Sequence, residues 1–204
     1  MIRKDNYLIQ AQQAKQRFLT YDQNALIRKF QLTADDAYLY VSFLRQTYRV
    51  CRRTGNLQKA DGCNWQDGNT YEEVMTLLDL LCDSRDDRTL SGIWQNMQSF
   101  GMQFHQNLLE EKRNPFAEQI DADPDLFHRA AAALSADPMR GGDIGYAFEL
   151  FDGLKIGLLF WHGDDEFAPR IRYFWDQNAK QYIRYETMYF ATGLLQQQIR
   201  TLGK

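Results

Sequence analysis

The segment "IGYAFELFDGLKIGLLFW", residues 144–161, decides the fold class that we expect for this chain. Two apolar runs flank Asp152 and Gly153, a pair that is typical of two-residue hairpin turns because such turns need positive φ angles. Both runs contain few polar residues, which is typical of strands that are buried on two faces. The segment therefore predicts a β-hairpin in the middle of an antiparallel sheet.

Helical patterns surround this hairpin. The clearest is "TYEEVMTLLDLLC", residues 70–82, in which Thr70 and Glu73 match a capping box and the leucines form one apolar stripe. The whole chain, residues 1–204, is predicted to be a single α+β domain with an antiparallel sheet covered by helices. Further helices are expected over residues 7–18, after Asp22, over 102–111, after Asp123 and over 186–202, and further strands over 37–44, 47–52 and 170–175.

The hairpin also predicts which residues face each other. If the Asp-Gly pair is the turn, Ala147 faces Leu158, and a small residue opposite a large one favours dense packing. Asp143 then falls opposite His162. The acidic run of residues 164–166 follows directly and is expected to share that end of the sheet.

Carboxylate and imidazole groups at one end of a sheet can bind a ligand or a metal. Carboxylate oxygens suit hard divalent cations, and an imidazole adds affinity for transition metals. We therefore predict a site for a small molecule or a divalent metal, formed by Asp143, Trp161, His162, Asp164 and Glu166. Within this set, His162, Asp164 and Glu166 are the expected metal ligands.

Three alternatives to a binding site are open. One is a metal-assisted hydrolase or proton-transfer enzyme that uses Asp164 or Glu166 as its base, although no common catalytic motif is present. The second is an accessory protein-interaction module that docks a partner through exposed rings at Tyr182, Tyr185 and Tyr189. The third is a structural role, because aspartates gather in turns where their side chains bond to their own backbone.

Composition argues against several classes of partner. The 24 basic and 27 acidic residues give a net charge of -3, so no nucleic-acid partner is expected. No run approaches the roughly 20 apolar residues that cross a bilayer, and the first residues lack a secretory signal, so we expect a cytoplasmic protein without membrane contact. Cys51, Cys63 and Cys82 contain no C-x-x-C pair, which predicts reduced thiols and no iron–sulfur motif.

Four short stretches resemble one family. "GGDIGYAF", "LLFWHGDDEFAP", "YFWD" and "YETM" are similar to the domain-of-unknown-function 3786 family, which is found mostly in anaerobic bacteria and archaea. The resemblance is best over about residues 139–195, and Ala168 stands where a second proline is expected. It implies the α+β fold but no particular reaction. It places the family's motif positions at Asp143, Trp161, Gly163, Asp164, Glu166, Phe167, Asp176 and Glu186.

Overall fold

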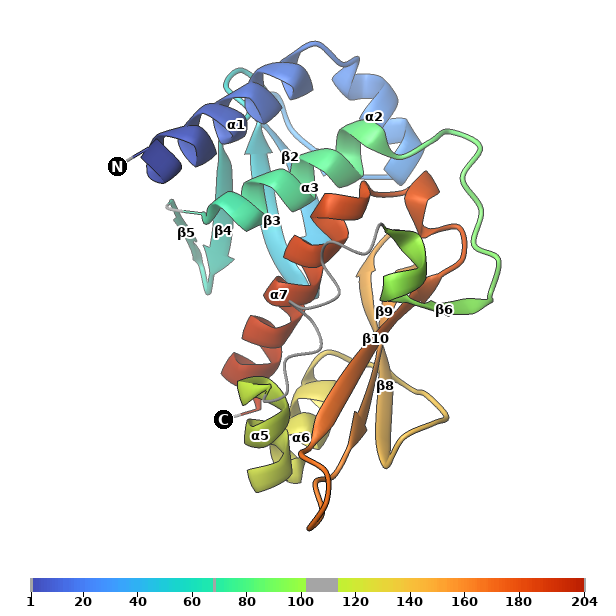
Figure 1. The fold of residues 1–204 in the computed structure, drawn as a ribbon. Coiled ribbons are helices and arrows are strands. Elements are labelled where there is room, and N and C mark those ends of the chain that lie inside the picture. The colour runs from blue at the N-terminus through green and yellow to red at the C-terminus, as the bar shows by residue number, and fades with distance from the viewer. Residues whose placement is uncertain (1, 68, 102–113, 204) are drawn as a thin grey trace. The chain divides into compact units, whose positions relative to one another are not determined.

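The structure is a computed structural model that describes residues 2–67, 69–101 and 114–203 (Figure 1). It divides into two compact units. Unit 1 comprises Met1–Thr89 and Lys180–Ala191, and unit 2 comprises Leu90–Ala179 and Thr192–Lys204. Each unit contains its own antiparallel sheet together with helices, which confirms the α+β class. That residues 1–204 form a single domain stays a prediction.

Unit 1 contains α1 (Ile2–Leu19), α2 (Gln23–Phe30), β1 (Thr33–Ala34), β2 (Tyr38–Phe43), β3 (Gln46–Cys51), β4 (Leu57–Asp61), β5 (Asn64–Gln66) and α3 (Tyr71–Asp83). Unit 2 contains β6 (Trp94–Asn96), η1 (Met97–Phe100), α5 (Pro115–Ala122), α6 (Pro124–Ala133), β7 (Asp137–Pro138), β8 (Ile144–Phe151), β9 (Leu154–Trp161) and β10 (Arg170–Asp176). The helices η3 (Ala179–Gln181) and α7 (Tyr185–Leu202) contribute residues to both units. In the ranges that the structure describes, no helix combines the length and the apolar character needed to span a membrane.

The sheet of unit 1 has the strand order β1-β2-β3-β4-β5. The strands expected over 37–44 and 47–52 are confirmed as β2 and β3, and they pair as a hairpin. Alternate residues of these strands, including Leu39, Val41 and Val50, are fully buried. The helices α1 and α3 lie side by side along one face of this sheet (Figure 1). The core of unit 1 therefore lies between this helix pair and the sheet.

Helix α3 begins as the sequence predicts. The Thr70 hydroxyl accepts a hydrogen bond from the Glu73 backbone N–H at 3.2 Å, and the Glu73 carboxylate accepts one from the Thr70 N–H at 2.8 Å. This capping box satisfies two backbone donors that the first helical turn leaves without partners. The second oxygen of the carboxylate accepts a hydrogen bond from the hydroxyl of Tyr48 at 2.8 Å, which links α3 to β3. The cap therefore also joins the helix to the sheet.

A buried carboxylate joins three helices within unit 1. The side chain of Asp79 in α3 is only 1% exposed, and it lies 2.6 Å from Nη2 of Arg17 in α1. The hydroxyl of Thr187 in α7 donates a second hydrogen bond to it. Burial raises the pKa of Asp79, while the hydrogen bonds from Thr187 and Arg17 oppose that rise. Arg17 also reaches Asp83 at 2.8 Å, one turn further along α3.

The sheet of unit 2 has the strand order β6-β10-β9-β8-β7, so the predicted hairpin is central, as expected. Asp152 and Gly153 form its turn with φ angles of 53° and 78°. The predicted third strand is confirmed as β10, which pairs with β9. On the inner face Phe127 of α6 stacks on Phe148 of β8 at 6.0 Å. The helices predicted after Asp123 and at the C-terminus are also confirmed, whereas the one predicted over 102–111 lies outside the described residues.

The predicted register of the hairpin is wrong beyond its turn. Ala147 faces Gly157 instead of Leu158, because a β-bulge lies between Glu149 and Phe151. Glu149 pairs with Lys155 and Phe151 pairs with Leu154, which leaves Leu150 as the extra residue of the bulge. One extra residue in β8 moves every pair beyond the bulge by one position.

Asp176, one of the family's motif positions, is an internal anchor of unit 2. Its carboxylate is nearly buried and accepts hydrogen bonds from the backbone N–H of Ser91 at 3.0 Å, of Gly92 at 2.7 Å and of Asn178 at 2.8 Å. Burial alone raises the pKa of Asp176, but these donors favour the ionised form and hold the pKa below its usual value. The carboxylate therefore ties the end of β10 to the segment before β6.

We predict that Asp79→Ala lowers the free energy of unfolding by about 3 kcal/mol, because removing one member of a buried ion pair leaves the other without its partner. Urea unfolding followed by far-ultraviolet circular dichroism measures this loss. Asp36→Ala is the matched control, since Asp36 is an exposed aspartate of the same unit. A loss no larger than that of the control would contradict a structural role for the buried pair.

We expect Asp176→Asn to lower the free energy of unfolding by an amount that depends on pH. The folded pKa lies below the unfolded value of about 3.9, so the ionised carboxylate stabilises the fold fully above that value and loses its contribution as the pH falls through the folded pKa. At pH 7 the variant should unfold more easily by about 2 kcal/mol. Urea unfolding followed by tryptophan fluorescence should show this difference shrinking below about pH 4. A difference that is independent of pH would show that the charge is not involved.

Candidate functional site

Three residues lie close together where β9 ends in unit 2, and we call Asp121, Asp143 and His162 the sheet-end cluster. Asp143 lies near His162, although the shifted register does not place the two residues directly opposite each other as predicted. Its carboxylate accepts a hydrogen bond from the backbone N–H of His162 at 2.8 Å, and its own N–H donates to the carbonyl oxygen of Phe160 at 2.8 Å. Asp143 therefore extends the pairing of β8 with β9 and does not contact the imidazole.

The imidazole of His162 is held by a residue that the sequence did not suggest. Its Nδ1 lies 2.7 Å from Oδ1 of Asp121, which comes from helix α5. The backbone N–H of Gly163 approaches the same oxygen at 3.4 Å. A side chain at Gly163 would lie 2.8 Å from Cδ of Pro169, so a glycine permits this close packing. Asp121 was missed because only tertiary structure brings it to the hairpin.

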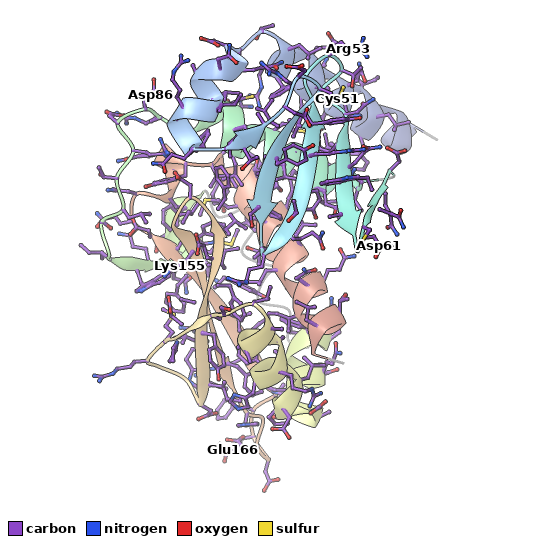
Figure 2. All side chains as sticks on the ribbon, turned by 180° about the vertical axis from the view of Figure 1, so that it is seen from behind. Cys51, Arg53, Asp61, Asp86, Lys155 and Glu166 are labelled. Atoms are coloured by element: carbon purple, nitrogen blue, oxygen red, sulfur yellow. The ribbon has the colours of Figure 1, made fainter. Side chains whose placement is uncertain are left out.

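The acidic run forms a closed turn. One carboxylate oxygen of Asp164 accepts hydrogen bonds from the backbone N–H groups of Glu166 at 2.9 Å and Phe167 at 2.7 Å. This is the geometry of the structural alternative, in which an aspartate satisfies its own turn. The side chain of Glu166 is exposed and points away from the ribbon (Figure 2).

Among the described residues, no group of three or more His, Cys, Asp or Glu side chains is placed to hold a metal. The metal site at His162, Asp164 and Glu166 therefore stays a prediction that the geometry does not support.

Trp161 faces away from the sheet-end cluster. Successive strand residues point to opposite faces of the sheet. The neighbouring Phe160 lies in the core, and the centre of its ring is 4.9 Å from the centre of the His162 ring. The Trp161 ring instead lies beneath the guanidinium groups of Arg170 and Arg172, at 4.7 and 5.9 Å from its centre. Of the predicted ligand-binding residues, the structure therefore brings together only Asp143 and His162.

The tyrosines proposed for protein docking differ from one another in exposure. Tyr182 is only 4% exposed, so the prediction that it is an exposed docking residue is wrong. The hydroxyl of Ser84 donates a hydrogen bond to the backbone carbonyl of Tyr182 at 2.8 Å, which fixes the segment around Tyr182 inside unit 1. Tyr185 and Tyr189 are half-buried, and their hydroxyl groups lie 2.5 Å apart.

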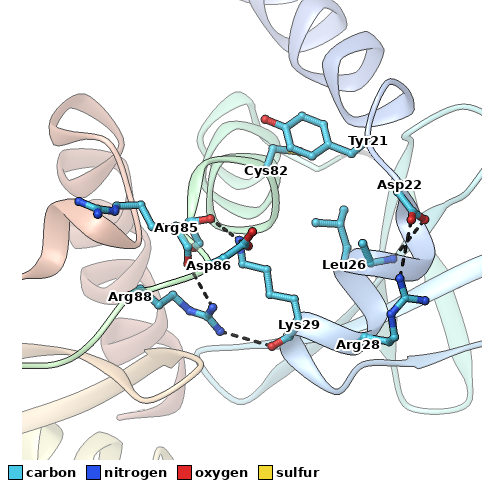
Figure 3. Close-up of a pocket in the computed structure, with 11 residues that line it drawn as sticks. Tyr21, Asp22, Leu26, Arg28, Lys29, Cys82, Arg85, Asp86 and Arg88 are labelled. Carbon is cyan, nitrogen blue, oxygen red and sulfur yellow. Dashed lines mark hydrogen bonds and ion pairs between the residues drawn. The ribbon is translucent and has the colours of Figure 1, made fainter.

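Unit 1 contains a pocket of about 760 Å³ that we call the basic pocket (Figure 3). Its walls come from helix α2 and from the residues at and after the end of α3. Four basic and two acidic side chains line it, so the lining carries an excess of two positive charges. The lining residues are Tyr21, Asp22, Ala25, Leu26, Arg28, Lys29, Cys82, Ser84, Arg85, Asp86 and Arg88.

Local structure fixes the basic wall of this pocket. Helix α2 begins at its cap Asp22, which places Arg28 and Lys29 in its last turn. The Lys29 ammonium donates a hydrogen bond to the backbone carbonyl of Ser84 at the end of α3 and pairs with Asp86 at 2.8 Å. The guanidinium of Arg88 lies over the Phe30 ring, 4.7 Å from its centre. Lys29 and Arg88 are thus held by hydrogen bonds and packing before any ligand binds.

The pocket also contains a thiol that is not reactive. Cys82 is buried, and burial raises its pKa to about 12. A thiol with so high a pKa is protonated at neutral pH, whereas nucleophilic attack requires the thiolate. Cys82 therefore contributes packing and no nucleophile. Like Cys51 and Cys63, it is a free cysteine.

The sequence contained little signal for this pocket. The stretch "DSRDDRT", residues 83–89, mixes both charges and resembles a solvated break between elements. The other wall, at Arg28 and Lys29, lies far away along the chain. Only the fold of unit 1 brings these two stretches of mixed charge together.

Comparison with known proteins identifies the family and nothing further. No curated protein and no solved structure matches the chain. A family model described as "Domain of unknown function (DUF3786)" matches residues 22–198, which covers most of both units. The resemblance seen in the short motifs thus extends over nearly the whole sequence, and the chain belongs to the DUF3786 family.

Proposed function

We propose that this protein binds a small anionic molecule in the basic pocket of unit 1. The observation that carries the proposal is a pocket of about 760 Å³ with four basic and two acidic side chains in its lining. Sites for small molecules commonly have volumes of about 300–1,000 Å³ and contain a few convergent polar groups. The proposal keeps the small-molecule function expected from the sequence and places it at a different site.

The arrangement of the donors favours an anion over a neutral ligand. Arg28 carries a planar guanidinium group, which suits the bidentate recognition of carboxylate or phosphate oxygens, and Arg85 adds a second positive charge although it pairs with Asp87. Lys29 is only 15% exposed, so its charge is largely withdrawn from water. An anion that reaches it is screened less than at an open surface. Tyr21 and Leu26 add apolar contact area for the body of a ligand.

The other features of the chain agree with a binding role. The high pKa of Cys82 keeps this thiol protonated at neutral pH, so Cys82 does not act as a nucleophile in this pocket. A cytoplasmic location is part of the proposal, and the three free thiols support it because reducing compartments keep cysteines unpaired. The net charge of -3 disfavours nucleic acid as the anionic partner.

A second function is favoured by one specific contact in unit 2. The carboxylate of Asp121 holds Nδ1 of His162 at 2.7 Å, which fixes the ring and directs Nε2 away from the carboxylate. Both side chains are partly exposed, at 31% and 42%, so a substrate can reach them. An oriented imidazole of this kind suits proton transfer. In this version of the enzyme hypothesis, His162 replaces Asp164 or Glu166 as the base.

We expect Arg28→Gln and Arg85→Gln each to weaken anion binding about threefold, a loss typical of one exposed charge contact. Isothermal titration calorimetry of the full chain with inorganic phosphate, malonate and citrate measures the dissociation constants. Both side chains are largely exposed, at 71% and 59%, so folding should be unchanged. Arg53→Gln is the matched control, because Arg53 is an exposed arginine of unit 1 outside the pocket lining. Absence of heat with all three anions, or an equal loss in the control, would contradict the proposal.

The proton-transfer alternative predicts hydrolysis of an activated ester such as p-nitrophenyl acetate. His162→Gln should lower the rate about a hundredfold, because it removes the only proposed base. His128→Gln is the matched control, since His128 is also exposed and also bonded through Nδ1, to the hydroxyl of Tyr146 at 2.7 Å. Equal rates for the two variants would exclude a special role for the imidazole held by Asp121.

A further inference from the structure

The basic pocket already contains an anionic group of its own chain. Oδ1 of Asp86 lies 2.8 Å from Nζ of Lys29, and Figure 3 shows the two side chains meeting at the pocket. The partners differ sharply in exposure, because the Lys29 side chain is 15% exposed and the Asp86 side chain 94% exposed. The carboxylate can move into water at little cost, whereas the ammonium stays in the pocket wall. Asp86 is therefore a removable occupant of the position in front of Lys29.

The surroundings keep Asp86 ionised and make this position cationic. The hydrogen bond from Lys29 lowers the pKa of Asp86, and the charge of Arg88 lowers it further. The neighbouring Asp87 does not compete for the position, because both of its oxygens accept hydrogen bonds from Arg85 at 2.8 and 2.7 Å. One exposed carboxylate thus faces two cationic side chains.

The second acid of the lining occupies a fixed place. Asp22 accepts hydrogen bonds from the backbone N–H groups of Asn24 at 2.9 Å and Ala25 at 3.2 Å, and it lies 3.7 Å from Arg28. As the cap of α2 it cannot leave without exposing those donors. Its negative charge disfavours a second anion near Arg28. The strongest anionic group of a ligand is therefore expected in front of Lys29 and Arg88.

The tethered carboxylate restricts the kind of anion that can bind there. A free monocarboxylate offers Lys29 the same group as Asp86, and it competes with one whose effective concentration is on the order of millimolar or higher. An external ligand displaces Asp86 only if it carries more negative charge or more acceptor oxygens than a carboxylate. A phosphoryl group brings both, because it carries up to two charges and three acceptor oxygens.

We propose that the ligand of the basic pocket carries a phosphoryl-type dianion, which displaces the carboxylate of Asp86 from Lys29 and binds between Lys29 and Arg88. The inference rests on the proposed anion-binding function and specifies its ligand class. Without Asp86 the remaining lining has four basic side chains against one acidic side chain, and Asp87 pairs with one of the four, Arg85, so a dianion neutralises the charge that remains. The rest of the ligand extends toward Tyr21 and Leu26, which form the less polar wall.

Removing the internal competitor tests this inference directly. Calorimetric titration of the full chain with inorganic phosphate and with acetate should show that the wild type binds phosphate and leaves acetate unbound. Asp86→Asn should tighten phosphate binding about fivefold, the scale of one exposed ion pair that no longer competes. Asp165→Asn changes the net charge equally at an exposed loop of unit 2 and should leave the affinity unchanged.

The possible outcomes separate the inference from the function on which it rests. Equal phosphate affinity of wild type and Asp86→Asn, or acetate binding as tight as phosphate binding, overturns the inference and leaves anion binding in place. Binding of malonate or citrate without binding of phosphate does the same. Absence of heat with every anion and every variant overturns both. Tighter binding in Asp86→Asn alone supports both.

Discussion

The buried carboxylate of Asp79 is the constraint on which the arrangement of unit 1 depends. A charge that is 1% exposed can be kept only where its partners are in place, and these partners come from α1 and α7. Arg17 meets Asp79 and Asp83 together, which sets how α1 lies along α3. The connection from α1 to α2 is short, so this contact also limits where α2 begins. The contact therefore also limits where the α2 wall of the basic pocket lies.

The pocket joins the end of one helix to the end of another. The last carbonyl groups of a helix lack hydrogen-bond donors within the helix. The ammonium of Lys29 in α2 donates a hydrogen bond to such a carbonyl, that of Ser84 at the end of α3. A lysine in this role has a structural reason to be withdrawn from water. The same withdrawal makes its charge more effective toward an anion. Lys29 can therefore support the end of α3 and also bind an anionic ligand. The carboxylate of Asp86 already pairs with the ammonium of Lys29.

The sequence predicted the features that depend on neighbouring residues. The capping box of Thr70 and Glu73 and the Asp152-Gly153 turn are both confirmed, because each is determined within a few residues. The register of the hairpin was not predictable in the same way. It depends on the bulge at Leu150, which the local sequence pattern does not indicate.

The candidate sites were harder to predict than the fold. His162 was identified correctly as a residue of the sheet end, but its partner Asp121 comes from a helix 41 positions earlier in the sequence. The acidic run was conspicuous as a charge cluster, yet Asp164 bonds to its own turn. The basic pocket combines two stretches 55 residues apart, neither of which has a large net charge. Charged residues that are close together in the sequence were thus a poor indication of which side chains come together in the structure.

The most direct test of the account locates the bound anion on the full chain. Two-dimensional NMR of the ¹⁵N-labelled protein, titrated in turn with inorganic phosphate and citrate, reports which backbone amides sense the ligand. We predict the largest chemical-shift changes at residues 21–29 and 82–88, which contain the lining of the basic pocket, and unchanged signals at residues 162–167. Changes concentrated at residues 162–167, or none at the pocket, would contradict it.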